Sequence, residues 1–368
     1  MCGIIGYSGP LDASKILLDG LSGLEYRGYD SAGIGLCMED TSICIAKKVG
    51  KVKNLREYCA ANIHGTAHSG IGHTRWATHG GVTDANAHPH RAGKVTLIHN
   101  GIIENYLEIR EFLEDKGVQF TSQTDSEVVA QLLEYCLGLD EVHCMQDAIY
   151  MVLHRIEGAY AFGIVCADDP ERIYAARKDT PLLLGYGDGC NFIASDVTAL
   201  VKYTRDVSYM EDGEVAVLTR DSIEVFNAME LPIEKEHHHV DWEISAAEKG
   251  GYPHFMLKEI MEQPEALRRA ITPRVKDGRI DFGDLILSRQ TVENFSRIMI
   301  IACGSSYHVG MLGKYTIEKL TRIPVEAVLA SEFRYCDPIV DDRTLVIVIS
   351  QSGETLDTMA ALREAKKR

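Results

Sequence analysis

Residues 1–6 read Met-Cys-Gly-Ile-Ile-Gly, and the cysteine directly behind the initiator methionine is the residue around which the rest of the sequence can be interpreted. A small residue at position two allows the methionine to be removed, which would leave Cys2 as the mature N-terminus with both a thiol and a free α-amine. The thiolate is the nucleophile of cysteine chemistry. An α-amine with a pKa near 7.7–8.0 can accept the thiol proton at neutral pH. Position two therefore predicts an N-terminal nucleophile whose base is its own amine.

Five further segments carry residue types that suit chemistry at a thiol. The first follows a predicted helix, the second and fourth end predicted strands, the third lies in a loop and the fifth opens a helix. They are Tyr26-Arg27-Gly28-Tyr29-Asp30-Ser31-Ala32-Gly33, His73-Thr74-Arg75-Trp76-Ala77-Thr78-His79-Gly80, Asn86-Ala87-His88-Pro89-His90, His99-Asn100-Gly101-Ile102-Ile103-Glu104-Asn105 and Thr124-Asp125-Ser126-Glu127.

These residue types supply what amide cleavage by a thiol requires. An Asn side chain beside a Gly backbone N–H, as at Asn100 and Gly101, can donate to the oxyanion of a tetrahedral intermediate. Arg75 can hold the carboxylate of a free amino acid in a bidentate fork, and Asp125 can hold its ammonium group.

Each segment also has a structural interpretation. Asn-Gly at 100–101 is the strongest short signal for a hairpin turn, and Thr124 with Glu127 fits a helix capping box. Trp76 could be a core residue. Five histidines in these segments could suggest a zinc site: His73, His79, His88, His90 and His99. Their spacing matches no usual ligand pattern and no cysteine pair accompanies them, which argues against zinc.

Composition indicates a globular protein of two domains. The chain has 368 residues, of which 45% are hydrophobic and 25% charged, and a formal net charge of -16. That charge argues against nucleic acid as a partner. No apolar run is long enough to span a bilayer and no signal peptide is apparent, so we expect a cytoplasmic protein. Ten scattered cysteines without a CxxC pair are expected to be reduced thiols.

Hydrophobic periodicity divides the chain at a polar segment. Up to residue 227, predicted strands (33–38, 43–48, 69–74, 95–99, 159–166, 182–186, 192–194, 214–218 and 222–226) alternate with predicted helices (12–25, 104–116, 126–138 and 145–156). This pattern favours layered sheets with helices outside. Residues 228–254, with three histidines at 237–239, are expected to be a solvated linker rather than a metal site.

Residues 255–368 have a different hydrophobic pattern from the first part of the chain. A helix is expected around 255–271, and the continuous apolar strands 297–302 and 345–349 each lead into a short polar loop and a helix. Such strands are typical of a parallel sheet covered on both faces. The two loops, Ala302-Cys303-Gly304-Ser305-Ser306 and Ser350-Gln351-Ser352-Gly353-Glu354-Thr355, can bind an anion with backbone N–H groups and hydroxyls at a helix N-terminus. N-cap serines alone would explain one such loop.

The sequence stops inside the last predicted helix, and an open sheet with so few strands is incomplete. We therefore expect the chain to be a fragment of a longer protein.

Taken together, the segments from residue 2 to about 225 resemble the class II glutamine amidotransferases. That resemblance implies an N-terminal-nucleophile (Ntn) hydrolase with a four-layer αββα sandwich over residues 1–227 and no cofactor or metal. Cys2 would attack the glutamine amide, with Asn100 and Gly101 forming the oxyanion hole. The remaining roles follow the family's motifs: Arg75, Thr78, His79 and Asp125 would bind glutamine, and Arg27, Trp76 and His88 would support the site.

The second part, residues 255–368, resembles the beginning of a first sugar-isomerase (SIS) domain. In members with this domain, glutamine and fructose 6-phosphate are the substrates, glucosamine 6-phosphate is the product, and the full-length protein is a homodimer. The sugar phosphate would be bound by Cys303, Gly304, Ser305, Ser350, Gln351, Ser352 and Thr355.

Three other interpretations are open at this point. Another class II amidotransferase would carry a phosphoribosyltransferase or ATP-pyrophosphatase domain, which the loop at 350–355 argues against. A non-catalytic SIS sugar-phosphate sensor would be expected to carry a DNA-binding domain. A structural protein with an incidental Cys2 would require five ordered motifs to coincide by chance.

Overall fold

The structure is a computed structural model of the chain. It describes every residue except 1, 78–79, 242–250, 277, 283–288, 352 and 354, together with the side chain of residue 289. The chain forms two compact units, Met1–Glu248 and Lys249–Arg368.

Two antiparallel sheets form the centre of the first unit. The eight-stranded sheet has the order β15-β11-β9-β10-β1-β4-β2-β3, and the seven-stranded sheet has the order β14-β13-β12-β8-β7-β6-β5. The strands of the first sheet are β1 (Gly3–Ser8), β2 (Ser31–Met38), β3 (Ile43–Val49), β4 (Ala67–Arg75), β9 (Leu183–Gly187), β10 (Cys190–Ala194), β11 (Asp206–Tyr209) and β15 (His238–His239). Those of the second are β5 (His90–Ala92), β6 (Val95–Ile103), β7 (Gly158–Cys166), β8 (Asp169–Lys178), β12 (Val215–Leu218), β13 (Ile223–Phe226) and β14 (Pro232–Ile233).

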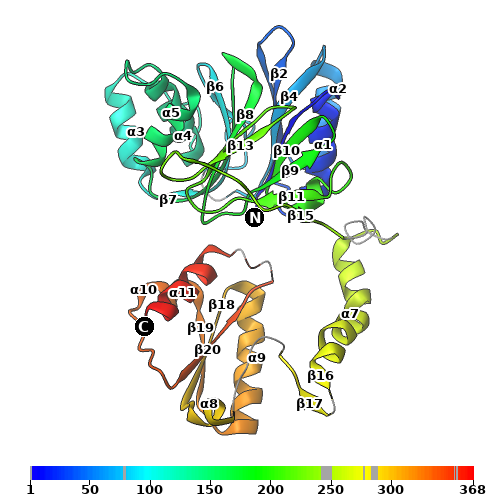
Figure 1. Cartoon of the computed structure of the whole chain (residues 1–368), viewed down its shortest axis with the longest axis vertical. Coiled ribbons are helices and arrows are strands. Elements are labelled where there is room, and N and C mark those ends of the chain that lie inside the picture. The colour runs from blue at the N-terminus through cyan, green and yellow to red at the C-terminus, as the bar shows by residue number, and fades with distance from the viewer. Residues whose placement is uncertain are drawn as a thin grey trace. The chain divides into compact units, whose positions relative to one another are not determined.

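Helices cover the outer face of each sheet (Figure 1). The eight-stranded sheet packs against α1 (Ala13–Leu24) and α2 (Val52–Asn62), and the seven-stranded sheet against α3 (Tyr106–Asp115), α4 (Asp125–Leu137) and α5 (Met145–Leu153). A third apolar core lies between the sheets. The expected four-layer αββα sandwich is therefore confirmed.

Strand β1 shows how alternation builds these layers. Ile4 belongs to the core between the sheets, whereas Ile5 and Tyr7 belong to the core beneath α1. Successive side chains of a strand point to opposite faces, so a strand buried on both faces is apolar throughout. All six residues of β1 are buried, so this strand is held by packing on both of its faces.

Several elements lack the signals on which the sequence prediction relied. Strand β8 begins with Asp169-Pro170-Glu171-Arg172, a polar stretch that hides a ten-residue strand. Helix α2 has only three buried residues, so its periodicity is weak. The predicted helices at 12–25, 104–116, 126–138 and 145–156 correspond to α1, α3, α4 and α5.

The segment expected to be a linker from residue 228 differs from that expectation over its first part. Strand β14 pairs with β13, and β15 pairs with β11. His239 Nδ1 lies 2.7 Å from Asp206 Oδ1, and the His237 ring stacks on Tyr186. Residues 232–239 thus extend both sheets of the sandwich, because edge strands offer free backbone groups to a polar segment as readily as to an apolar one.

The second unit contains the expected parallel sheet. Its order is β19-β18-β20, from Val325–Leu329, Arg297–Ala302 and Thr344–Ile349. Helix α9 (Gly304–Thr321) covers one face, where Ile298 and Ile300 are buried. Helices α10 (Ala330–Tyr335) and α11 (Leu356–Lys367) cover the other, with Met299 and Ile301. The predicted helix at 255–271 is α7 (Phe255–Ile271).

The remaining described elements of this unit are short. They are 3-10 turn η2 (Thr272–Arg274), strands β16 (Val275–Lys276) and β17 (Arg279–Ile280), and helix α8 (Arg289–Asn294); the first unit also has turn η1 (Val197–Ala199). No described helix in either unit has the length and apolar character needed to cross a membrane.

We predict that Phe162→Ala destabilises the first unit by about 3–5 kcal/mol, because Phe162 is fully buried beneath the helices that cover β7. Urea unfolding followed by circular dichroism measures the change. Phe282→Ala is the matched control: this ring is exposed, so the substitution should change the free energy of unfolding by less than about 0.5 kcal/mol. Equal effects of the two variants would contradict the assigned core.

Candidate active site

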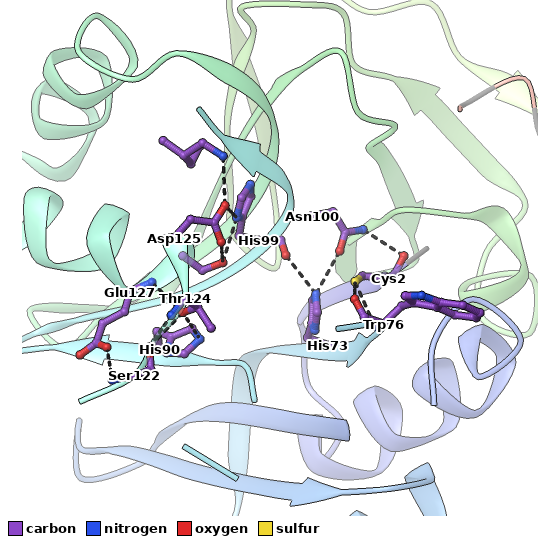
Figure 2. Close-up of polar contacts among 12 residues, drawn as sticks. Cys2, His73, Trp76, His90, His99, Asn100, Ser122, Thr124, Asp125 and Glu127 are labelled. Atoms are coloured by element: carbon purple, nitrogen blue, oxygen red, sulfur yellow. Dashed lines mark hydrogen bonds and ion pairs between the residues drawn. The ribbon is translucent and has the colours of Figure 1, made fainter. Parts of the chain in front are cut away.

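Cys2 is held at one end of the sandwich by the strand that follows it. In β1, Gly3 pairs with Thr74 of β4, which brings Cys2 beside Trp76 at the end of that strand. Asn100 and Gly101 reach the same place from β6 of the opposite sheet. Figure 2 shows Asn100 between the Cys2 main chain and the His73 ring.

The Cys2 thiol is hydrogen bonded to the main chain of Trp76. The Trp76 N–H donates to Sγ at 3.2 Å, and the thiol donates to the Trp76 carbonyl at 3.4 Å. Burial raises the pKa of the Cys2 thiol, and the Trp76 N–H and the Arg75 charge oppose that rise only in part. A group that accepts the thiol proton is therefore needed before the sulfur can attack.

The Asn100 side chain bridges Cys2 and His73. Its Nδ2 donates to the Cys2 carbonyl at 3.1 Å, and its Oδ1 lies 3.0 Å from His73 Nε2. The amide N–H group therefore points toward the nucleophilic residue, as an oxyanion donor must.

Gly101 occupies a position that only glycine fits. Its φ is +130°, and a Cβ there would lie 2.0 Å from the Ala159 carbonyl oxygen on β7. The Asn-Gly pair lies within β6, paired with Ala161 and Tyr160. The hairpin-turn interpretation of this pair is therefore wrong.

A pocket at Cys2 brings most of the expected residues together. Its lining residues are Cys2, Arg75, Trp76, His88, His99, Gly101, Thr124, Asp125 and Ser126. The Arg75 guanidinium donates to the carbonyl oxygens of Gly81 and Gly80 at 3.2 and 3.4 Å. Asp125 Oδ2 accepts from the Ile103 N–H at 3.0 Å, which ties the start of α4 to the end of β6.

Thr124 caps helix α4, and this role is compatible with the position of Asp125 in the pocket. The Thr124 hydroxyl accepts from the Glu127 N–H at 3.3 Å, as an N-cap does. The Glu127 carboxylate bonds the N–H groups of Thr121 and Ser122 instead of returning to Thr124. Capping therefore sets the start of α4, and the helix start presents Asp125 to the pocket.

Arg27 is connected to the Cys2 strand indirectly, through Ser195. Its guanidinium donates to Asp196 Oδ2 at 2.7 Å and to the Ser195 carbonyl at 3.2 Å. Ser195 in turn bonds Ile4 twice, through its hydroxyl at 2.9 Å and its N–H at 3.0 Å. Arg27 thus supports the strand that carries Cys2.

Trp76 is 46% exposed and meets Tyr29 edge to face at 5.7 Å, so its interpretation as a core residue is wrong. Thr78 and His79 lie outside the described residues. His88 lines the pocket, yet both of its ring nitrogens are buried without a hydrogen-bond partner among the described residues.

Three buried histidines surround the floor of the site. The rings of His73 and His88 are tilted by 32° with their centres 4.1 Å apart, and those of His88 and His90 meet edge to face at 4.7 Å. Burial lowers the pKa of His73 to about 3 and holds the pKa of His88 and of His90 well below the ordinary value. Their rings are neutral at pH 7, and no group of three His, Cys, Asp or Glu in the described residues is arranged to hold a metal.

The residues expected to bind a sugar phosphate follow the carboxyl ends of two neighbouring strands. Ala302 pairs with Ile349, so Cys303 and Ser350 follow at the same sheet edge. The two loops lead to helices on opposite faces, α9 and α11, which is the switch point where open parallel sheets bind ligands. Ser350 Oγ accepts from the Gly353 N–H at 2.9 Å.

The other described residues of this set are partly or fully exposed. Thr355 is the residue before α11, and Gly304 and Ser305 begin α9. Gln351 is exposed, and Ser352 lies outside the described residues.

Comparison with known proteins identifies the domains of the chain. A model of the glutamine amidotransferase domain matches residues 73–202, and a model of the SIS domain matches residues 293–368. The chain is 50% identical over 370 residues to glutamine–fructose-6-phosphate aminotransferase [isomerizing] of Clostridium acetobutylicum, and 48% identical over 373 residues to that of Thermus thermophilus. Both alignments cover 100% of this chain.

The chain carries a glutamine amidotransferase domain followed by SIS-domain sequence.

It spans 60% of the length of these curated relatives. Among solved structures, the amidotransferase fold is shared with glutamine phosphoribosylpyrophosphate amidotransferase from B. subtilis (TM-score 0.53, 21% identity, 88% of this chain and 65% of that one). It is also shared with an allosteric regulatory enzyme of purine biosynthesis (TM-score 0.57, 19% identity, 97% of this chain and 91% of that one).

Some residues of this amidotransferase site were not singled out from the sequence. His73 and His99 were considered only as zinc ligands, yet His73 contacts Asn100, and His99 Nδ1 bonds the Ser126 hydroxyl at 2.9 Å. Asp30 accepts from the Ala77 N–H at 2.9 Å and so fixes the chain after Trp76. All three lie in motifs that the sequence displays, but only the fold shows which partner each one meets.

We predict that the buried histidines make the first unit lose stability as pH falls from about 6.5, the ordinary histidine value, toward 5. The unfolded state takes up protons in this range, whereas the native state does not, so stability is present above pH 6.5 and is lost below it. His88→Phe should reduce this loss by about 1.4 kcal/mol per pH unit, because one such group is removed. Urea unfolding at several pH values measures the slope.

Phe192→Leu is the control for this experiment, because it perturbs a fully buried ring that does not titrate. It should lower stability at every pH without changing the slope. An unchanged slope in His88→Phe would show that His88 is protonated in the native state.

Proposed function

We propose that the first unit is a glutaminase in which Cys2 attacks the side-chain amide of L-glutamine. The observation that carries the proposal is the Cys2 thiol in a pocket with Arg75 and Asp125, with Asn100 Nδ2 3.1 Å from the Cys2 carbonyl. These residues have the charges that a free amino acid requires: Arg75 for the α-carboxylate and Asp125 for the α-ammonium group.

The reaction can be written with named atoms. The Cys2 sulfur bonds to the amide carbon, and the carbonyl oxygen becomes an oxyanion that accepts from Asn100 Nδ2 and the Gly101 N–H. The leaving nitrogen takes the proton that the Cys2 α-amine received from the thiol, and collapse of the intermediate breaks the C–N bond, releases ammonia and leaves a thioester. Water then attacks the thioester, releases glutamate and restores the thiol.

The base in this proposal is the α-amine of Cys2 after removal of Met1. Burial raises the pKa of the thiol, so the sulfur needs a local proton acceptor. His73 Nε2 faces two oxygen atoms, the His99 carbonyl and Asn100 Oδ1, and so has no lone pair for this purpose. An α-amine, with a pKa near 7.7–8.0, is free in part at neutral pH.

For the whole protein we propose synthesis of glucosamine 6-phosphate from fructose 6-phosphate and glutamine. The second unit would bind the sugar phosphate through Cys303, Gly304, Ser305, Ser350, Gln351, Ser352 and Thr355. Support comes from the similarity to glutamine–fructose-6-phosphate aminotransferases and from the two loops at one switch point of the sheet. A cytoplasmic location and a homodimer belong to the same proposal, as do the supporting roles of Trp76, Thr78, His79 and His88.

The glutaminase proposal predicts one covalent adduct on Cys2 when the processed chain meets a glutamine-analogue electrophile. Intact mass before and after treatment, with N-terminal peptide mapping, measures both methionine removal and labelling. Cys2→Ser is the control and should stay unlabelled, although its nine other cysteines remain. A folded, processed and unlabelled Cys2 would contradict the proposal.

The sugar-phosphate proposal predicts that Thr355→Val weakens binding of fructose 6-phosphate by roughly tenfold, because a hydroxyl donor to the phosphate is lost. Isothermal titration calorimetry measures the affinity. Thr321→Val, at the far end of α9, is the matched control and should bind as the unmodified chain does. Equal affinity in both variants would remove Thr355 from the site.

A further inference from the structure

His73 makes one of the two hydrogen-bond contacts that orient the Asn100 amide, and the Cys2 carbonyl makes the other. The residue lies on β4 and is 1% exposed. Its Nε2 lies 3.1 Å from the His99 carbonyl oxygen and 3.0 Å from Asn100 Oδ1 (Figure 2). One ring nitrogen thus faces two oxygen atoms.

The chemistry of these partners decides where the ring proton lies. A main-chain carbonyl can only accept, so Nε2 must carry the hydrogen. Since burial lowers the pKa of His73 to about 3, the ring holds a single proton at neutral pH. Nδ1 is buried without a partner among the described residues, so nothing favours the other tautomer.

The Nε2–H tautomer determines which way the Asn100 amide faces. Oxygen and nitrogen of an amide are nearly interchangeable in shape, and the hydrogen-bond network selects between the two orientations. If the amide were flipped, its NH₂ group would face the His73 N–H, donor against donor. The oxygen must therefore face His73, which leaves Nδ2 directed at Cys2, 3.1 Å from its carbonyl.

We propose that His73 is a positioning residue for the oxyanion donor: its Nε2–H fixes the Asn100 amide so that Nδ2 faces the reacting carbonyl. This rests on the proposed glutaminase function and assigns it a further residue. His73 itself touches neither the nucleophile nor the substrate amide; it acts through Asn100.

The ring is well held for this purpose. It packs against the His88 ring with the ring centres 4.1 Å apart, and β4 is paired on both sides, with β1 and β2. Asn100 is likewise fixed by the pairing of β6 with β7. Because both main chains are held by sheets, a single proton between them suffices to select the amide orientation, which is the preorganisation that oxyanion stabilisation requires.

The test measures glutamine hydrolysis by the processed chain carrying His73→Phe, His73→Gln, Asn100→Ala or both His73→Phe and Asn100→Ala. Phenylalanine keeps a packed ring without the donor, whereas glutamine restores an N–H. Labelling of Cys2 by a glutamine-analogue electrophile counts competent sites in each preparation, so that kcat is given per labelled site.

We expect His73→Phe to lower kcat by roughly 10–100-fold with KM changed by less than about threefold, since the lost interaction acts on the transition state. His73→Gln should recover most of that loss. Asn100→Ala should lower kcat by about 10²–10³-fold. Adding His73→Phe to it should cause less than about a twofold further loss, because the residue through which His73 acts is gone.

Two readouts separate this role from a merely structural one. Phe192→Leu, in the core beneath α1, serves as a variant with lowered stability and should keep wild-type kcat per labelled site. The pH dependence of kcat should keep its shape in His73→Phe, since a positioning residue does not titrate in the working range.

Three results would contradict the proposed role of His73. Wild-type kcat in His73→Phe, additive losses in the double variant, or loss of the acidic limb of the pH profile would each overturn the inference while leaving the glutaminase intact. An unmodified, processed chain that neither labels nor hydrolyses glutamine would instead overturn the proposed function, and this inference with it.

Discussion

The site depends on the pairing of β1 in the middle of the eight-stranded sheet. Gly3 pairs with Thr74 on one side, and Ile5 pairs with Ala194 of β10 on the other. The fit is close: a Cβ on Gly3 would lie 2.6 Å from the Thr74 hydroxyl. A chain terminus is usually poorly ordered unless it is tied down in this way. Two flanking strands convert the second residue of the chain into a fixed point at which a nucleophile can be presented.

The sequence predicted the layers better than the individual strands. Clear periodicity at α1, α3, α4 and α5 and apolar runs such as 159–166 predicted layered sheets with helices outside, whereas the four-layer sandwich followed from the family resemblance. The hydrophobic pattern did not predict strand β8, because the first residues of that strand are polar. It did not predict the strands within 232–239, because pairing at a sheet edge does not require apolar side chains. The hydrophobic pattern of a sequence reflects which side chains are buried. Backbone hydrogen bonds at a sheet edge do not depend on burial, so the pattern does not predict them.

The motifs predicted which segments meet at Cys2, but not how their atoms are paired. Asn100-Gly101 in isolation has the composition of a turn, and only the register with β7 places it inside a strand. His73 carries no sequence signal for its contact with Asn100, since that contact crosses from one sheet to the other. Contacts of this kind depend on tertiary packing, which local patterns do not encode.

The division of labour among the layers bears on how such a protein can change over evolutionary time. The Cys2 pocket takes its residues from strand ends, from their loops and from the start of α4, and none from α1, α2, α3 or α5. Those four helices contribute apolar cover alone, and cores accept many alternative apolar residues of similar volume. Lineages can therefore exchange much of the outer shell while the inner sheets preserve the reaction geometry. The same layered architecture thus allows substitutions in the outer helices and restricts them at the strand ends.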